Sequence, residues 1–227
     1  MKNQSQFVFH KTKQRYENRC LPCKSLYTIE KNRSIRLRNR DYIQSVKSNT
    51  PCSACGNKYH FCQLDFNHID PSTKRYELWR VTTQSLVSIK AEIAKCELIC
   101  ANCHREKTQQ SFGQIKLDAS LVNQRYSAFI NDLKSDKVCP DCDGKYPYYV
   151  MDFDHLAAKN FEMNRARQQR VDKDKVRAEV AMCALVCVNC HRLRTYRKSI
   201  NTSTSEASSL SVDPSPGLFE PPTFPAV

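Results

Sequence analysis

Ten of the thirteen cysteines occur in C-x-x-C pairs, which have the spacing of metal ligands, and eight of these ten form two matching sets of four. A C-x-x-C pair is followed, after 44 residues, by a second C-x-x-C pair, and the whole arrangement occurs twice. The two sets are Cys52, Cys55, Cys100 and Cys103, and Cys139, Cys142, Cys187 and Cys190. Four thiolates from two such pairs are the ligands that tetrahedral structural zinc prefers. Because four sulfurs leave no coordination position open, each predicted zinc ion would stabilise the fold and take no part in chemistry. Redox-active dithiols are the alternative explanation of the same pairs.

A histidine directly follows each downstream pair, in CANCH (100–104) and CVNCH (187–191). Covalent haem attachment has the same C-x-x-C-H form. Haem attachment, however, accompanies export, needs a distal axial ligand and has no use for another C-x-x-C pair 44 residues upstream at both places. The pattern therefore favours zinc-held turns that leave His104 and His191 for another task.

The chain contains an internal repeat, because a shift of 87 residues aligns its two halves without a gap. The eight paired cysteines fall into register, as do Lys58-Tyr59 with Lys145-Tyr146 and Asp65-Phe66 with Asp152-Phe153. His68 aligns with His155 in the same register. We interpret this as a duplication of one structural unit.

Between the cysteine pairs lie LDFNHIDP (64–71) and MDFDHLAA (151–158). Together with CANCHREKT and CVNCHRLRT, these segments resemble the HNH endonucleases whose ββα-metal core is braced by two C-x-x-C pairs. The resemblance covers residues 50–112 and 137–198. It implies, for each half, a β-hairpin packed on a helix, one catalytic divalent metal ion, and hydrolysis of a phosphodiester bond in DNA.

The resemblance also implies roles for particular residues. His68 and His155 match the general bases, and the ligands of the catalytic cation would be Asn67 and His104 in one half and Asp154 and His191 in the other. Phosphodiester hydrolysis needs a base that activates water and a cation that neutralises charge on the phosphate. An unperturbed imidazole, with a pKa of about 6.5, takes up a proton near neutral pH. Two protein ligands leave the rest of the shell to water and phosphate oxygens, as suits Mg²⁺ or Mn²⁺.

Two departures from the family pattern bear on which half is the catalytic site. The residue before the base is Asn67 in the first half, and an uncharged amide binds Mg²⁺ less well than Asp154 does in the second. The middle asparagine of the family is replaced by Lys95 and Met182, so another group must orient the hairpin. We therefore rank the second half first as the catalytic site, with the first half active, weakened or reduced to DNA binding. For His68 and His155 a capping or core position is the alternative, and for the aligned aspartates at 65 and 152 we favour a structural role in the hairpin.

The apolar periodicity predicts an α+β fold of two small mixed units with flanking helices. The resemblance implies that these are two tandem small ββα-metal (HNH-like) units. We expect helices at 39–46 and 126–133, β structure at 59–67 and 146–154, second helices ending near Cys96 and Cys183, and third helices after each downstream cysteine pair. The predicted organisation is a basic segment at 1–34, unit 1 at 35–114, unit 2 at 115–198, and a disordered Ser- and Pro-rich tail at 199–227.

The composition points to a polyanionic partner, because the 227 residues carry a formal net charge of +13. We expect double-stranded DNA, bound through phosphates by basic residues near the two sites: Arg36, Arg38, Arg40, Arg105, Lys107, Arg192, Arg194, Arg197 and Lys198. A non-catalytic zinc-ribbon protein that binds DNA or RNA is the alternative function. The odd number of cysteines and the lack of an apolar N-terminal stretch predict an intracellular, reducing compartment and no membrane association. The pair Cys20 and Cys23 would either join a third zinc site, with Cys62 or His60, or remain as unligated thiols.

Overall fold

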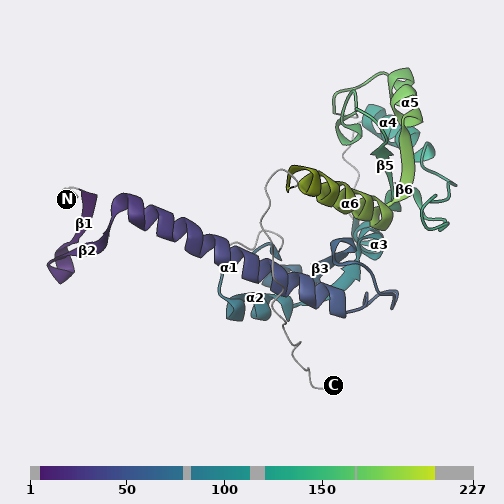
Figure 1. Ribbon diagram of the computed structural model, residues 1–227. Helices are drawn as coiled ribbons and strands as arrows, with labels where there is room; N and C mark the ends of the chain where they lie inside the picture. The colour runs from purple at the N-terminus through teal and green to yellow at the C-terminus, as the bar shows by residue number, and fades with distance from the viewer. Residues whose placement is uncertain (1–5, 79–82, 113–120, 167, 208–227) are drawn as a thin grey trace. The chain divides into compact units, whose positions relative to one another are not determined.

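The computed structural model describes residues 6–78, 83–112, 121–166 and 168–207. Within these ranges the protein is a mixed α/β structure of six helices and three two-stranded antiparallel sheets (Figure 1). The chain divides into two compact units, Met1–Leu193 and Arg194–Val227. The candidate metal centres and the candidate active site below lie in the first unit.

The N-terminal part is a hairpin followed by a long helix. Strands β1 (Phe7–His10) and β2 (Arg15–Cys20) pair with each other, and α1 spans Leu21–Asn49. A proline in the first turn of α1 suits a helix start, where a missing N–H costs no hydrogen bond. The predicted boundary at residue 34 falls inside α1, so the part of the basic segment from Leu21 onward and the first helix of unit 1 form one continuous helix.

Each half of the chain contains the same hairpin. In the first half β3 (Leu64–His68) pairs with β4 (Cys96–Cys100), so that Leu64 lies opposite Cys100 and His68 opposite Cys96. In the second half β5 (Met151–His155) pairs with β6 (Cys183–Cys187) in the equivalent register. Short 3-10 turns, Phe61–Gln63 and Tyr148–Val150, precede β3 and β5. The expected β structure is thus confirmed for the later part of each stretch, and the earlier part is a 3-10 turn.

Helices connect and follow the hairpin strands. The connecting helices are α2 (Leu86–Ile93) and α5 (Lys173–Ala181), and the following ones are α3 (Ala101–Phe112) and α6 (Val188–Ala207). Helix α4 (Leu121–Asp132) precedes the hairpin of the second half. The prediction that the second helices reach Cys96 and Cys183 is wrong, because both cysteines begin strands. A short apolar run such as CELIC or CALVC fits either a helix end or a buried strand.

The hydrophobic cores of the two hairpins are small and include zinc-ligand candidates. One cluster consists of Cys52, Leu64, Leu98, Ile99 and Cys100, and the other of Cys139, Val150, Met151, Val186 and Cys187. Cores of this size stabilise a fold poorly without a further crosslink. A metal ion bound by the cysteines would supply that crosslink.

Helix α6 continues past Ser199, where the sequence predicted the tail to begin, and ends at Ala207. The remaining residues, 208–227, lie outside the described residues, so disorder there stays a prediction. Within the described ranges, every helix is too short or too polar to cross a bilayer.

Candidate metal centres and active site

The structure brings each predicted set of four cysteines together. In both clusters all Sγ atoms lie within 4.8 Å of one another. Tetrahedral zinc with Zn–S bonds of about 2.3 Å places its sulfurs about 3.8 Å apart, so both clusters have the dimensions of a zinc site. The first turn is closed by the N–H of Gly56, which donates to the carbonyl of Cys52 at 2.8 Å, and the equivalent bond from Asp143 to Cys139 is 2.9 Å. Both donors adopt positive φ angles, 73° and 54°, as such a tight turn requires.

Backbone hydrogen bonds favour the thiolate form that metal ligation needs. Burial acts to raise the pKa of Cys52, but hydrogen bonds from the N–H groups of Cys100, Cys55 and Ala54 outweigh it and lower the pKa from 9.0 to about 7. The pKa of Cys103 is instead raised, by burial and by the neighbouring cysteines. Four thiolates cannot be crowded together without a compensating cation, and a bound Zn²⁺ ion would supply that charge.

A buried glutamate holds the predicted base of the second half. His155, the last residue of β5, has its Nε2 2.9 Å from Oε1 of Glu179 on α5. Glu179 is 1% exposed and also accepts hydrogen bonds from the backbone and side-chain N–H groups of Asn160, at 2.9 and 2.7 Å. Burial acts to raise the pKa of Glu179, but these hydrogen bonds outweigh it and keep the pKa below the usual range. Because a carboxylate only accepts, Nε2 of His155 carries the proton and Nδ1 is the nitrogen left to accept one.

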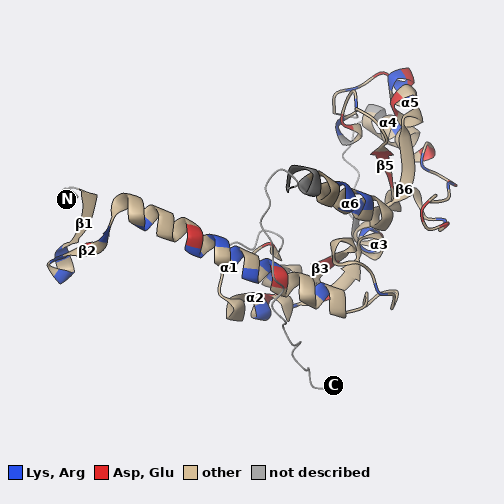
Figure 2. Ribbon diagram, in the orientation of Figure 1, with Lys and Arg blue, Asp and Glu red and all other residues tan. Residues whose placement is uncertain are grey.

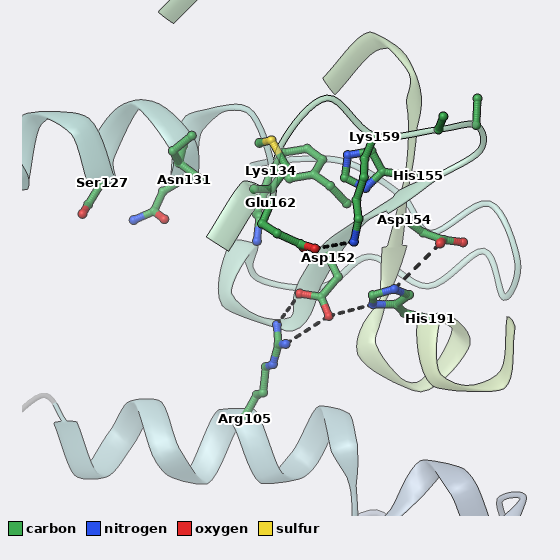
Figure 3. A pocket seen from close by; sticks show the side chains of 15 residues that line it. Arg105, Ser127, Asn131, Lys134, Asp152, Asp154, His155, Lys159, Glu162 and His191 are labelled. Atoms are coloured by element: carbon green, nitrogen blue, oxygen red, sulfur yellow. Dashed lines mark hydrogen bonds and ion pairs between the residues drawn. The ribbon is translucent and has the colours of Figure 1, made fainter. Parts of the chain in front are cut away.

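The two predicted metal ligands of the second half face each other. His191 has its Nε2 3.8 Å from Oδ1 of Asp154, and its Nδ1 is 3.1 Å from Oδ2 of Asp152 (Figure 3). The longer distance exceeds a hydrogen bond. Two ligands about 2.1 Å from one octahedral ion lie about 3 to 4.2 Å apart, so the gap has the size of a Mg²⁺ or Mn²⁺ site. Asp152 holds the Nδ1–H tautomer of His191 and leaves Nε2 as the possible ligand.

The first half shares part of this arrangement. His68 Nε2 lies 2.9 Å from Glu92 Oε1, and His104 Nδ1 lies 2.9 Å from Asp65 Oδ2. Asn67, however, donates through Nδ2 to Oε1 of Glu97 at 2.8 Å.

The same Glu97 oxygen forms an ion pair with Lys107. The hydrogen bond from Lys107 is the main cause that lowers the pKa of Glu97. In the second half the residue opposite Asp154 is Ala184, which has no such carboxylate. The first half therefore holds an amide, a carboxylate and an ammonium group where the second half presents Asp154.

Both sites open into pockets. The pocket at the second site has a volume of about 810 Å³ and is lined by Asp152, Asp154, His155 and His191 (Figure 3). The equivalent pocket of the first half measures about 400 Å³.

A half-buried lysine lies at each pocket. Lys134 donates to the carbonyl of Met151 at 2.7 Å, and Lys47 donates to that of Leu64 at 2.6 Å. Burial lowers the pKa of both amines. These lysines, like Glu92 and Glu179, are site residues that sequence reasoning did not assign. Both pairs fall into the 87-residue register, which is the signal that identifies them.

The predicted DNA-contacting residues separate into two groups. Arg105, Lys107 and Arg192 form ion pairs with carboxylates, namely those of Asp152, Glu97 and Asp65 respectively. The others are more exposed: Arg36, Arg38 and Arg40 are exposed on α1, Arg197 and Lys198 are exposed on α6, and Arg194 of α6 is partly exposed. Arg40 also forms an ion pair at 3.3 Å with Asp41, which is exposed as well. Arg36 and Arg40 are four residues apart and share a helix face, which Arg38 does not.

The pair at Cys20 and Cys23 does not extend the metal-binding set. Among the described residues, neither these cysteines nor His60 and Cys62 belong to a group of three or more side chains placed to hold one ion. Cys62 Sγ instead lies 3.0 Å from His60 Nδ1.

The described residues thus define a mixed α/β protein with two four-cysteine clusters that could each bind a metal ion, consistent with two zinc sites. No protein-family model, curated protein or solved structure matches the chain.

Proposed function

We propose that the protein is a metal-dependent DNA endonuclease and that its second half hydrolyses the phosphodiester bond. The observation that carries the proposal is the grouping of His155, held by Glu179, with the facing pair of Asp154 and His191 at one open pocket. A base and a two-ligand cation site are the two components that this hydrolysis needs.

Each side chain has a separate task in the proposed reaction. His155 accepts the proton of the attacking water at Nδ1, and Glu179 stabilises the imidazolium that forms. Asp154 and His191 would hold a divalent cation, which would neutralise charge on the phosphate and on the leaving oxygen. Lys134, whose amine lies beside the pocket, adds positive charge on the side of Asp152.

The departures from the HNH pattern have physical substitutes in this proposal. The family's middle asparagine is absent at Met182, and Glu179, which lies on the helix before it, fixes the base. Lys95 replaces the asparagine in the first half, where Glu92 takes the same position toward His68. Since both halves keep the glutamate, the orientation of the base does not depend on the missing asparagine.

A nucleic-acid-binding role without catalysis is the second candidate, and the first half favours it. There Asn67 bonds to Glu97, which Lys107 already neutralises, so the group beside the base is an engaged amide. We infer that the first half contributes to DNA binding more than to hydrolysis.

Helices α1 and α6 supply basic surface for the DNA backbone, since Lys and Arg outnumber Asp and Glu along both (Figure 2). Exposed arginines that contact phosphates give affinity that falls steeply with salt and carries little sequence selection. The net charge of +13 supports such a contact with a polyanion.

Nicking of supercoiled plasmid with Mg²⁺ or Mn²⁺ tests the proposal. The variants are His155→Ala, His68→Ala and the double variant, which are matched because the two histidines are equivalent in the repeat. We expect His155→Ala to abolish nicking and His68→Ala to retain most of it, with about two zinc ions per chain in every variant. Cation-dependent nicking by the double variant would exclude both histidines as bases, and no nicking by the zinc-loaded wild-type protein would favour the binding role.

A further inference from the structure

Arg105 of the first half reaches the site of the second half. From α3 its guanidinium donates through Nη1 to Asp152 Oδ1 at 2.8 Å and through Nη2 to Oδ2 at 3.0 Å (Figure 3). Nη1 also donates to the carbonyl of Tyr149 at 3.1 Å. Asp152 is the aspartate that holds Nδ1 of His191. The arginine and the histidine are thus joined through one carboxylate.

The reverse contact is also present. Arg192, which follows His191 on α6, donates through Nη1 to Asp65 Oδ1 at 2.7 Å, and Asp65 holds Nδ1 of His104. Arg105 and Arg192 are equivalent in the 87-residue repeat, as are the two aspartates. When residue i of one copy contacts residue j of the other and the reverse also holds, the contact is of the kind that a twofold interface makes.

A second reciprocal contact supports this relation between the halves. The N–H of Asn102 donates to Oδ1 of Asn189 at 3.2 Å, and the N–H of Asn189 donates to Oδ1 of Asn102 at 3.0 Å. Both residues are in the first turns of α3 and α6 and are buried, at 6% and 3% exposed. N–H groups in a first turn have no partner within their own helix. Each helix start is therefore capped by the side chain of the other half.

We propose that each site is completed by an arginine from the opposite half: Arg105 is a positioning residue for His191, and Arg192 is one for His104. A guanidinium that donates two parallel hydrogen bonds fixes the plane of a carboxylate, which a single ammonium charge does not. Asp152, fixed in this way, keeps the ring of His191 turned with Nε2 toward Asp154. The part of this inference that concerns catalysis rests on the proposed function, whereas the crossed positioning does not.

The crossed positioning is tested by the tautomers of the histidine rings. Long-range ¹H–¹⁵N correlation spectra would be recorded on the full-length, zinc-loaded protein without added Mg²⁺. We expect Arg105→Gln to shift the ring nitrogens of His191 toward the average of the two tautomers and to change His104 less. The matched variant Arg192→Gln should shift the ring nitrogens of His104 and change His191 less. A change at the histidine of the same half that equals or exceeds the change at the histidine of the other half, or no change at either ring, would overturn the proposal.

Two further measurements separate positioning from other roles. In the His68→Ala background, Arg105→Gln should lower nicking about 10- to 100-fold, because residues that orient a metal ligand have effects of that size. Arg105→Lys keeps the positive charge but loses the two parallel hydrogen bonds of the guanidinium, so its nicking rate should stay well below that of the wild-type protein. Full activity of the lysine variant would assign Arg105 to a simple charge contact and overturn the positioning role.

Failure of this inference is distinguishable from failure of the proposed function. If the wild-type protein does not nick, the histidine spectra still decide whether the positioning is crossed. If the protein nicks and Arg105→Gln leaves the rate unchanged, the positioning role is refuted while the endonuclease stands. If Arg105→Gln does not retain about two zinc ions per chain, the spectrum of Arg105→Lys decides instead, with a His191 shift expected and an unchanged His191 ring refuting the proposal.

Discussion

The two buried glutamates should respond differently to the same substitution by glutamine. Glu92 accepts through Oε1 from His68 and from the N–H of Arg75, and through Oε2 from the ammonium of Lys95 at 2.7 Å. Lys95 is held there by a further bond to the carbonyl of Thr73. In Glu92→Gln the new NH₂ group faces a donor whichever carboxylate oxygen it replaces. At the Oε1 position it meets the backbone N–H of Arg75, and at the Oε2 position it meets the ammonium group of Lys95, and neither group can accept a hydrogen bond.

The surroundings of Glu179 can adapt to the same change. Its Oε1 accepts from His155 and from the N–H of Asn160, and among the described residues its Oε2 accepts only from the side-chain amide of Asn160. In Glu179→Gln, a turn of the Asn160 amide presents an oxygen to the new NH₂ group, so every donor keeps a partner. Glu92→Gln should therefore cost about 1–3 kcal/mol more stability than Glu179→Gln, which is the cost of one unsatisfied buried donor.

Thermal unfolding of the zinc-loaded full-length variants measures this difference. For a chain of this size, about 1–3 kcal/mol corresponds to a melting temperature about 2 to 12 °C lower for Glu92→Gln than for Glu179→Gln. Burial acts to raise the pKa of Glu92, but the bonds from Lys95, Arg75 and His68 lower it from 4.5 to about 2. Because the pKa of Glu92 is lower in the folded protein, its ionised carboxylate stabilises the fold fully above pH 4.5, and this stabilisation is lost as the pH falls toward 2. The comparison is therefore made at pH 7. Equal melting temperatures, or a lower one for Glu179→Gln, would refute the reasoning.

Three other predictions concern zinc, DNA and catalysis. Chelation of zinc should unfold both hairpins, which circular dichroism would detect as a loss of ellipticity. Cys139→Ser should retain about one zinc ion per chain by elemental analysis. A Cys139→Ser variant that keeps two zinc ions would show that the second cluster is no zinc site. Arg36→Gln and Arg40→Gln should each reduce the salt dependence of DNA affinity by the equivalent of about one phosphate contact. Arg38→Gln, which changes a residue on another face of the helix, is the control. Equal effects of all three variants would contradict a defined contact face. Glu179→Gln should lower plasmid nicking at least about tenfold at unchanged zinc content, and an unchanged rate would remove Glu179 from the site.

Local spacing in the sequence was enough to find the metal-binding cysteines. A C-x-x-C pair forms one turn, and its hydrogen bonds, such as that from Gly56 to Cys52, lie within that turn. The chemistry of four thiolates then requires the two turns to meet around a cation. Asp154 and His155 are adjacent in the chain, so their proximity was also certain from the sequence, although their orientation and role were not.

The partners of these residues were decided by tertiary structure. Glu179 is 24 residues from His155, and they meet because the register of β5 and β6 brings α5 back over the strand end. Strand β6 itself was missed, since a five-residue apolar run has no distinctive period. The contact of Arg105 with Asp152 joins two halves that the repeat alone cannot orient. Sequence thus determined which groups could bind metal, because ligand spacing is local, whereas only the folded chain decided which carboxylate holds each histidine, because hydrogen bonds form wherever packing brings donor and acceptor together.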